Sequence, residues 1–461
     1  MAKPWATLGV DLHLEPAGPG LRRGLTDALR EAVRTGRLTA GTRLPSSRSL
    51  AADLGIARNT VADAYADLVA EGWLTARQGS GTRVADRAVV PPAGQAPRPR
   101  TRTRPAYDLR PGTPDLASFP RAEWLRAARR ALTAAPHDAL GYGDPRGRPE
   151  LRTALAGYLA RARGVRADPE RLLVLGGFAH GLTLLAAVLK ARGVHTVAVE
   201  SYGLHVHRDL LTAAGLRTVP LPFDARGTDP VGPADAGAVL LTPAHQFPMG
   251  VPLHPDRRAA VVDWARRTGG LVLEDDYDGE FRYDRQPVGA LQGLDPDRVV
   301  YLGTASKSLA PGLRLAWAVL PPGLADDLAA SRGGLDTSGV LDQLTLAEFL
   351  TSGAYDRHVR SARLRYQRRR DALVAALADR APEVRVTGIA AGLHAVLGLP
   401  PGTEQQVVRA AAWQGLALYG LSLFRHPEAV TEPRDAVVVG YGTPPDHAWA
   451  GALDALCRAL P

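Results

Sequence analysis

The chain has 461 residues, of which 45% are hydrophobic and 22% are charged, and these values exclude a wholly disordered protein. Its single cysteine, Cys457, excludes a disulfide-stapled scaffold. The formal net charge is +9, but residues 1–105 contain 16 of the 56 basic residues and only 9 of the 47 acidic ones. A basic first quarter ahead of a near-neutral body favours a module that binds a polyanion over a basic tail without a partner.

The sequence contains no pattern of a targeting or membrane-spanning segment. The N-terminal MAKPWATLGVDLHLEP lacks the apolar region of a secretory signal. No segment approaches the roughly 18 consecutive apolar residues of a membrane helix. We therefore expect a cytoplasmic protein without a membrane partner. At roughly 150 residues per domain, its length predicts two or three domains.

Residues 21–84 have the pattern of a compact helical module. Apolar residues recur at helical spacing from Leu21 to Val33. Gly41 and Pro45 then interrupt the chain, and Ser46 is placed to cap the short helix that follows. In chain order, we predict helices over 21–33, 47–54 and about 58–71, and extended segments at 72–75 and 81–84.

The segment from Gly41 to Val84 resembles the GntR-type winged helix-turn-helix, through LPS before the second helix, the LG turn, RNTV and the GSGT wing. Polar residues at the start of the third helix can enter a major groove, where arginine pairs with guanine and asparagine with adenine. A winged helix that binds only protein is the alternative. The resemblance implies a double-stranded DNA operator contacted by Arg48, Arg58, Asn59, Thr60, Gln78 and Gly79, with Arg43 as a further phosphate contact.

One position in this module departs from the family pattern. Relatives often have a serine N-cap before the third helix, whereas this chain has Ala57. We expect this difference to lose about 1 kcal/mol of helix capping, and no DNA contact.

Residues 86–106 read as a linker between a DNA-binding domain over 1–85 and a large domain over 107–461. The segment contains five prolines and four alternating arginines, and too few apolar residues to form a core. As extended polyproline it would span on the order of 60 Å. A solvated spacer is favoured over arginines that touch DNA phosphates.

From Tyr107 onward, short apolar segments alternate with helical stretches. Continuous apolar strands separated by helices predict a parallel sheet that is covered on both faces. After Pro321 the pattern predicts helices, including a long basic one around Tyr355–Leu377, and a smaller α+β region with strands near Gly392–Leu399 and Ala436–Val439. The predicted strands of the large sheet are Leu172–Leu175, Thr196–Val199, Ala238–Leu241, Leu271–Leu273 and Val299–Leu302.

Two chemically suggestive side chains lie at the ends of predicted strands. Only three basic residues are lysines, Lys3, Lys190 and Lys307, and Lys307 follows a predicted strand. Asp275 ends another. Ligands bind at the carboxyl ends of parallel strands, and a lysine with a strand-end carboxylate suggests pyridoxal phosphate chemistry. Either residue alone would be read as an ordinary surface charge.

Five further stretches make the resemblance specific: GYGDPRG (141–147), LGGFAHG (175–181), TPAHQFPMG (242–250), EDDYDGEFRY (274–283) and GTASKSLAPGLRL (303–315). They are similar to the fold-type I aminotransferase domain of MocR regulators. The resemblance implies a multidomain protein: a winged helix-turn-helix, a linker, and an α/β aminotransferase-like domain with a small C-terminal α+β subdomain. It also implies pyridoxal 5'-phosphate as cofactor, no metal, and a homodimer.

The resemblance assigns roles residue by residue. Lys307 would be the Schiff-base lysine, Asp275 would face the pyridine nitrogen, and Tyr277 would face the 3-hydroxyl. Backbone N–H groups at a helix start would hold the phosphate. The phosphate-binding residues would be Gly177, Phe178, Ala179, Thr304, Ser306 and Arg314, with Tyr142 reaching across from the partner subunit.

Several positions depart from the aminotransferase pattern. The asparagine of the NPTG motif is replaced within HQFPMG, where we assign its role to His245, with Gln246 as the alternative. His180 stands where relatives often have glutamine, and a structural role is favoured there. For the ring-stacking aromatic, the aligned residue is Leu204, with His205 and Tyr202 as stand-ins. For an effector carboxylate, we assign Arg434, with Arg425 and Arg208 as rivals.

The resemblance implies a transcriptional regulator that senses pyridoxal phosphate, or an amino compound that reacts with it, and that uses its large domain for sensing rather than turnover. Genes of vitamin B6 or amino-acid metabolism are the expected targets. An aminotransferase with an accessory DNA-binding domain is the alternative, because Lys307 and Asp275 are both present. A scaffold with a vestigial cofactor site is a third reading.

Overall fold

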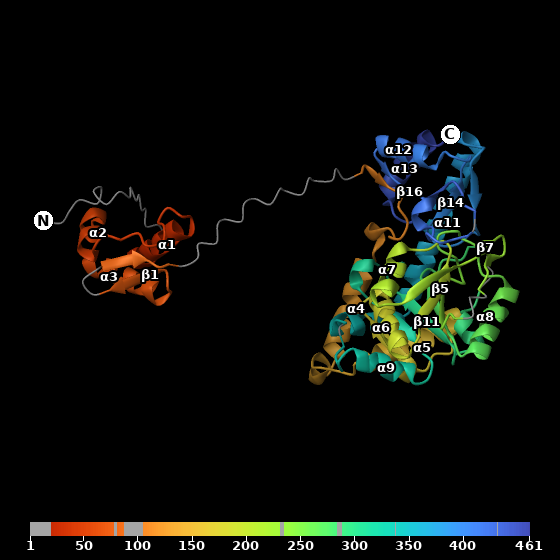
Figure 1. The fold of residues 1–461 in the computed structure, drawn as a ribbon, viewed down its shortest axis with the longest axis horizontal. Coiled ribbons are helices and arrows are strands. Elements are labelled where there is room, and N and C mark those ends of the chain that lie inside the picture. The colour runs from red at the N-terminus through yellow and green to blue at the C-terminus, as the bar shows by residue number, and fades with distance from the viewer. Residues whose placement is uncertain are drawn as a thin grey trace. The chain divides into compact units, whose positions relative to one another are not determined.

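The computed structural model forms two compact units, Met1–Arg104 and Pro105–Pro461 (Figure 1). This division falls near the end of the predicted linker, most of which lies outside the described residues, as do Lys3, Gln78 and Gly79. The structure describes residues 20–77, 81–86, 105–230, 235–283, 288–336, 338–430 and 432–461.

The N-terminal unit has the predicted order of helices and hairpin. Its elements are α1 (Leu21–Arg34), α2 (Ser47–Leu54), α3 (Arg58–Ala70), β1 (Leu74–Arg77) and β2 (Gly81–Val84). The two strands are antiparallel, with Leu74 opposite Val84. Apolar residues from all three helices and both strands form one core. The Tyr65 hydroxyl also donates to the Pro45 carbonyl at 3.1 Å, which joins α3 to the segment before α2.

The helix caps of this unit agree with the sequence analysis. The Ser46 hydroxyl accepts a hydrogen bond from the Ser49 backbone N–H at 3.1 Å, so Ser46 caps α2. Ala57 occupies the N-cap position of α3 and provides no side-chain cap.

Substitutions at these two N-cap positions should change the stability of the unit in opposite directions. Ser46→Ala should destabilise the unit by about 1 kcal/mol, and Ala57→Ser should stabilise it by a similar amount. For a unit of this size, each change corresponds to a shift of about 4–8 °C in the unfolding midpoint. Calorimetry of the full chain measures both shifts. Equal midpoints in the two variants would contradict the assignment of the caps.

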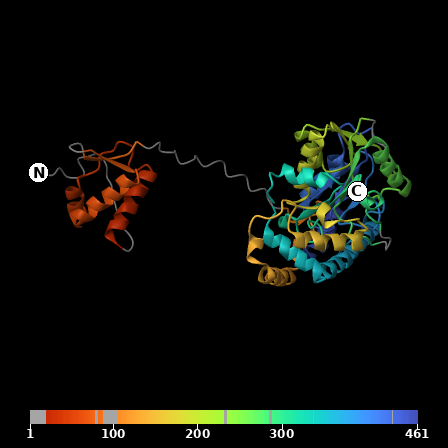
Figure 2. The same cartoon turned by 90° about the horizontal axis from the view of Figure 1, so that it is seen from below.

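The large unit is built on a seven-stranded sheet with the order β4-β12-β11-β10-β9-β5-β6. Alternate residues of β4 face two different cores: Leu173 and Leu175 pack into one, and Leu172 and Val174 into the other. Helices therefore cover both faces, as predicted, and Figure 2 shows them around the sheet. The strands are β4 (Leu172–Leu175), β5 (Thr196–Glu200), β6 (Arg217–Leu221), β9 (Ala238–Leu241), β10 (Leu271–Asp276), β11 (Val299–Thr304) and β12 (Ala316–Val319).

The five predicted strands run in the same direction, but the sheet contains two further strands that the sequence analysis did not predict, β6 and β12. β12 runs antiparallel to both β11 and β4, while the other strand pairs of this sheet are parallel. Every residue of β12 is buried. An antiparallel strand that is buried on both faces has the same apolar pattern as a parallel one, so the sequence pattern cannot separate them.

A smaller sheet, β13-β14-β17-β16, forms the C-terminal subdomain with α12 and α13, drawn in blue in Figure 1. The long helix α11 (Ala354–Arg380) confirms the predicted basic helix. No helix within the described ranges is long and apolar enough to span a membrane. The small sheet and its helices are β13 (Arg385–Thr387), β14 (Ala395–Gly398), β16 (Tyr419–Gly420), β17 (Ala436–Val439), α12 (Glu404–Trp413) and α13 (Asp446–Ala459).

The remaining elements complete the cover of the large sheet and link it to the subdomain. β3 (Tyr107–Asp108) pairs with β15 (Leu416–Ala417), which ties the start of the large unit to its C-terminal subdomain. The hairpin of β7 (Phe223–Asp224) and β8 (Gly227–Thr228) follows β6. The helices are α4 (Arg121–Ala134), α5 (Pro149–Arg163), α6 (Phe178–Ala191), α7 (His205–Ala213), α8 (Pro255–Thr268), α9 (Leu324–Ser331) and α10 (Val340–Thr351).

Candidate functional site

Strand register brings the predicted lysine and carboxylate together. β10 and β11 are parallel neighbours, with Asp275 opposite Leu302. Lys307 follows the end of β11 at Thr304. Because both strands end at the same edge of the sheet, the two side chains meet there.

The same edge gathers the predicted phosphate-binding segments. Ala316 of β12 pairs with Leu175 of β4 on one side and with Thr304 of β11 on the other. The turn after β4 and the turn after β11 are therefore held close together. Thr304 also shares a hydrogen bond with Ser306, Oγ to Oγ, at 2.9 Å.

Gly177 and Arg314 form a tight cradle at this edge. A Cβ on Gly177 would lie 2.7 Å from Arg314 Nη2. Gly177 also precedes α6 with no side-chain cap, so first-turn N–H groups remain for a ligand. Among the described residues, Arg314 is the one non-glycine with positive φ, at 53°. Such a conformation costs about 1–3 kcal/mol and is typical of functional sites.

A cavity opens at this edge. Of the predicted residues, Lys307, Asp275, Tyr277, Phe178, Thr304 and Ser306 line it. Gly177, Ala179, Arg314, Tyr142, His245 and Arg434 do not belong to its lining. Leu204, named above as the aligned position for the ring-stacking aromatic, also lines it. The lining residues that sequence reasoning missed are Pro111, Gly112, Gly203, His207, Phe247, Leu393 and His394.

The Lys307 amine is anchored by a segment distant in sequence. Its Nζ donates to the Gly112 carbonyl at 2.5 Å. Burial lowers the pKa of Lys307, and the carboxylates of Asp275 and Asp278 oppose that shift. A lowered pKa increases the fraction of neutral amine, which is the nucleophilic form.

Asp275 is a buried carboxyl with an unsatisfied oxygen. Its Oδ1 is shielded from solvent and has no hydrogen-bond partner in the described structure. Burial raises the pKa of Asp275 well above its ordinary value, although the Lys307 charge opposes this. Because buried polar groups normally have partners, the site fits a ligand with a donor aimed at this oxygen.

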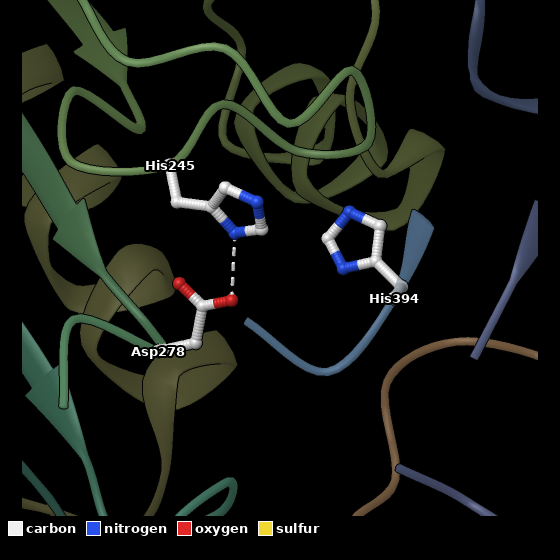
Figure 3. A group of neighbouring side chains, drawn as sticks. All are labelled: His245, Asp278 and His394. Carbon is white, nitrogen blue, oxygen red and sulfur yellow. Dashed lines mark hydrogen bonds and ion pairs between the residues drawn. The ribbon is translucent and has the colours of Figure 1, made fainter. Parts of the chain in front are cut away.

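Behind the cavity, His245, Asp278 and Tyr277 form a hydrogen-bonded group, of which Figure 3 shows the first two. His245 Nδ1 lies 2.8 Å from Asp278 Oδ2 and 3.1 Å from the Tyr277 hydroxyl. A carboxylate only accepts, so we assign the Nδ1 hydrogen to the Asp278 bond. The Tyr277 hydroxyl also interacts with Asp278, and Tyr277 lines the cavity. His245 thus contacts Tyr277. It does not line the cavity, so its position favours a role behind Tyr277 over direct contact with a cofactor.

The group His245, Asp278 and His394 has donor atoms within 4.8 Å of one another, as metal ligands do. His245 and Asp278 bond to each other, however, and His394 Nε2 donates to the Pro248 carbonyl at 3.0 Å. Burial lowers the pKa of His394 to about 3. The geometry is that of a hydrogen-bonded network.

His207 is the aromatic residue that sequence reasoning missed. Its ring lies 4.6 Å from that of Phe178, with an interplanar angle of 33°. Burial and the nearby Lys307 charge lower the pKa of His207 to about 4, so its ring is neutral. Of the aligned candidates, Leu204 lines the cavity, whereas Tyr202 packs against Phe223 in the core. Leu204 and His207 lie three residues apart at the start of α7, and this helical spacing could have indicated His207.

The remaining candidates from the aminotransferase pattern lie outside the cavity lining. Arg434 is exposed and sits over the Phe223 ring, 5.8 Å from its centroid, so the role assigned to Arg434 is not supported. Arg208 donates to the carbonyls of Gly203 and Phe424. His180 accepts from the Gly176 N–H at 3.0 Å, which agrees with a structural role.

In the N-terminal unit, the predicted DNA-contacting arginines have no side-chain partner among the described residues. Arg22 and Arg30 of α1 pair with Asp67 and Glu71. By contrast, the exposed guanidinium groups of the residues predicted to contact DNA make no side-chain hydrogen bond or ion pair with any described residue. Asn59 is likewise exposed, and Thr60 is half-buried, at the start of α3. The arginines predicted to contact DNA are Arg43, Arg48 and Arg58, and Arg23 of α1 is likewise exposed and without a partner among the described residues.

Comparison with known proteins identifies relatives of both units. Residues 21–84 match the family of bacterial regulatory proteins, gntR family, and residues 108–430 match aminotransferase class I and II. The "HTH-type pyridoxine biosynthesis transcriptional regulator PdxR" of Corynebacterium glutamicum is 36% identical over 91% of each chain. The "probable rhizopine catabolism regulatory protein MocR" of Rhizobium meliloti is 34% identical over 91% of this chain and 90% of its own.

Solved structures with the same fold are aminotransferases. An archaeal alanine:glyoxylate aminotransferase matches with a TM-score of 0.68 and 22% identity, covering 77% of this chain and 90% of its own. LysN, the α-aminoadipate aminotransferase of Thermus thermophilus, in complex with N-(5'-phosphopyridoxyl)-L-leucine, matches with a TM-score of 0.67 and 25% identity, covering 77% and 91%.

Proposed function

The chain belongs to the MocR-type members of the gntR family, and from this membership we propose that it is a transcriptional regulator whose DNA binding responds to pyridoxal 5'-phosphate or to an amino compound that reacts with it. The observation that carries the proposal is that Lys307 and Asp275 line one cavity, in which the buried Oδ1 of Asp275 has no hydrogen-bond partner among the described residues. Vitamin B6 or amino-acid metabolism is the proposed field of regulation.

The residues of the cavity, together with the Gly177–Arg314 cradle at the same sheet edge, fit this cofactor. When bound, pyridoxal 5'-phosphate supplies an aldehyde that bonds reversibly to amines. Lys307 supplies the amine, and Asp275 holds a proton on the ring nitrogen. Tyr277 donates toward the 3-oxygen, while Gly177 and Arg314, with the neighbouring residues of both turns, hold the phosphate.

The test of the proposed function is a DNA-binding titration with and without cofactor. The full chain is titrated against the DNA upstream of its own gene, in the presence and absence of pyridoxal 5'-phosphate. We expect the affinity or the protected region to change, because a ligand shifts DNA binding only if it binds two states differently. An identical affinity and footprint in both conditions would refute a sensing role.

Asp275→Asn separates cofactor binding from stability. Loss of a charged hydrogen bond of about 1.5–3 kcal/mol should weaken cofactor binding roughly 10- to 100-fold. The stability of the unloaded protein should stay equal or rise, because the change removes a buried carboxylate without a full set of partners. Equilibrium dialysis and thermal unfolding with and without cofactor measure the two effects. Unchanged cofactor affinity would contradict the role of Asp275.

An aminotransferase that carries a DNA-binding unit is the second candidate. The presence of both Lys307 and Asp275 in the cavity favours it. Steady turnover of an amino acid with a keto acid, at ordinary enzyme rates and independent of DNA, would support this alternative. A single slow round of amine exchange would support sensing.

A homodimer is also part of the proposal. Leu125 and Leu132, seven residues apart on α4, are 67% and 51% exposed, and Leu140 and Tyr142 are 56% and 99% exposed. Residues seven apart share a helix face, and an exposed apolar surface of this kind is typical of subunit contacts. The nearly complete exposure of Tyr142 agrees with its proposed role of reaching the partner subunit's phosphate. Sedimentation of the full chain tests the dimer.

A further inference from the structure

A second cavity in the large unit shares no lining residue with the first. Its lining is strongly charged, whereas the first cavity is mainly apolar. The C-terminal end of α5, the segment after β10 and the first half of α11 enclose it. Its charged residues are Arg161, Arg163, Glu280, Asp356, Arg360 and Arg363.

Two of the four arginines already have carboxylate partners. Arg163 is buried and donates to both oxygens of Asp276, at 2.7 and 2.9 Å. Arg161 pairs with Asp356 at 2.9 Å. The charges of these two arginines are therefore balanced within the protein.

The other two arginines have no carboxylate partner. Arg363 donates from Nε and Nη2 to the backbone carbonyl of Glu280, at 3.0 and 2.7 Å, which leaves its charge unbalanced. Arg360 is exposed and makes no hydrogen bond or ion pair within the described ranges. The two lie three residues apart on α11, where like charges repel. An anion between them would remove this repulsion.

The Glu280 side chain provides less negative charge than its type suggests. Burial raises the pKa of Glu280 to about 7; the Asp276 carboxylate adds to the shift, and Arg163 opposes it. The hydroxyls of Tyr355 and Tyr158 lie 3.1 and 3.3 Å from Glu280 Oε1. Near neutral pH, the cavity therefore keeps an excess of positive charge.

We propose that this cavity is a second ligand site, which binds a small phosphate-type oxyanion between Arg360 and Arg363. Guanidinium groups match the oxygens of phosphate in geometry and charge. Inorganic phosphate and the phosphate group of a small phosphorylated metabolite share this chemistry.

The site is joined by hydrogen bonds to Ser308, the residue next to Lys307. The Tyr355 hydroxyl links Glu280 to Ser308, whose Oγ lies 2.8 Å away. His358 Nε2 lies 2.8 Å from the Ser308 carbonyl. Ser308 is the residue next to Lys307, and both Tyr355 and His358 belong to α11, the helix that carries the two arginines. An anion on α11 is thus linked to the segment that holds Lys307 through Tyr355 and His358.

Calorimetric titration of the full chain, without cofactor, tests the site. One arm uses inorganic phosphate and the other uses a sugar phosphate. The double variant R360A/R363A should lose at least tenfold in affinity. Arg368→Ala, an exposed arginine on the same helix, should bind as the unmodified chain does. Arg314→Ala, which alters the proposed cofactor site, should retain this binding event.

The outcomes distinguish binding at this cavity from binding elsewhere on the protein. Tighter binding of the sugar phosphate than of inorganic phosphate would assign the ligand to phosphorylated metabolites, and the reverse would assign it to free phosphate. Arg363→Lys keeps a cation and should retain part of the affinity. This variant therefore shows whether the loss in R360A/R363A comes from the missing charges or from misfolding. Equal affinity in R360A/R363A and the unmodified chain, an equal loss in Arg368→Ala, or no saturable binding would overturn the proposal. None of these measurements depends on the cofactor, so they stand apart from the test of the proposed function.

Discussion

Lys307→Ala is expected to abolish covalent retention of pyridoxal 5'-phosphate. Lys307 is the lysine that lines the cavity, with its Nζ 2.5 Å from the Gly112 carbonyl. Without this amine, no bond to the aldehyde can form at this place, and the visible absorbance of the bound cofactor should disappear. Mass spectrometry after borohydride reduction should find no cofactor adduct.

The chain offers a matched control for this experiment. Lys190 is exposed near the end of α6 and donates to the Gly215 carbonyl at 2.9 Å. Lys190→Ala should keep the absorbance and the adduct. If Lys307→Ala retained a stoichiometric adduct, the assignment of the lysine would be wrong. If it lost the adduct but kept a normal response of DNA binding to cofactor, covalent attachment would not be part of sensing.

The second large effect is expected at the start of α3. The double variant R58A/N59A should lose sequence-specific DNA binding. Each side chain can make a bidentate contact worth about 1–3 kcal/mol of discrimination, so the combined loss is about 30-fold or more. Both residues are exposed, and Arg58 has no side-chain partner among the described residues. Removing them should therefore leave the fold unchanged.

The control and the salt dependence distinguish base reading from phosphate contact. Arg37 is exposed in the same unit, and Arg37→Ala should bind as the unmodified chain does. Arg48→Ala should weaken binding to specific and random DNA alike, and should lower the salt slope by about one. Titrations at several salt concentrations measure these effects. Retained preference for the upstream DNA in R58A/N59A would show that α3 does not read the sequence.

Much of the fold followed from local patterns. The predicted strands Leu172–Leu175 and Ala238–Leu241 coincide with β4 and β9, and the predicted helix Ser47–Leu54 coincides with α2. Periodicity and turn residues suffice there because each element depends on its own residues. Two strands of the large sheet, β6 and β12, were not predicted. The antiparallel strand β12 has the same fully buried pattern as β11 and β4, so such a pattern does not specify strand direction.

The residues of the candidate site that lie within recognisable motifs could be predicted from the sequence, and the residues that surround them could not. Lys307, Asp275 and Tyr277 were identified in short stretches that keep their spacing, and all three line the cavity. Gly112 and His394 belong to stretches without a recognisable pattern. They reach the cavity because the start of the large unit and the small subdomain pack against the edge of the sheet.

By itself, the sequence determined that this protein joins a basic winged helix-turn-helix to an aminotransferase-like domain. It also identified Lys307 as the lysine to examine, because the chain has only three lysines and the motif spacing around Lys307 can be read directly from the sequence. Only the tertiary structure decided which of its many arginines are balanced by acids. Arg163 meets Asp276 across 113 positions of sequence, while Arg360 and Arg363 meet no carboxylate within the described residues. The energy of a charge depends on its neighbours in space and on its burial, and neither can be read from the chain alone.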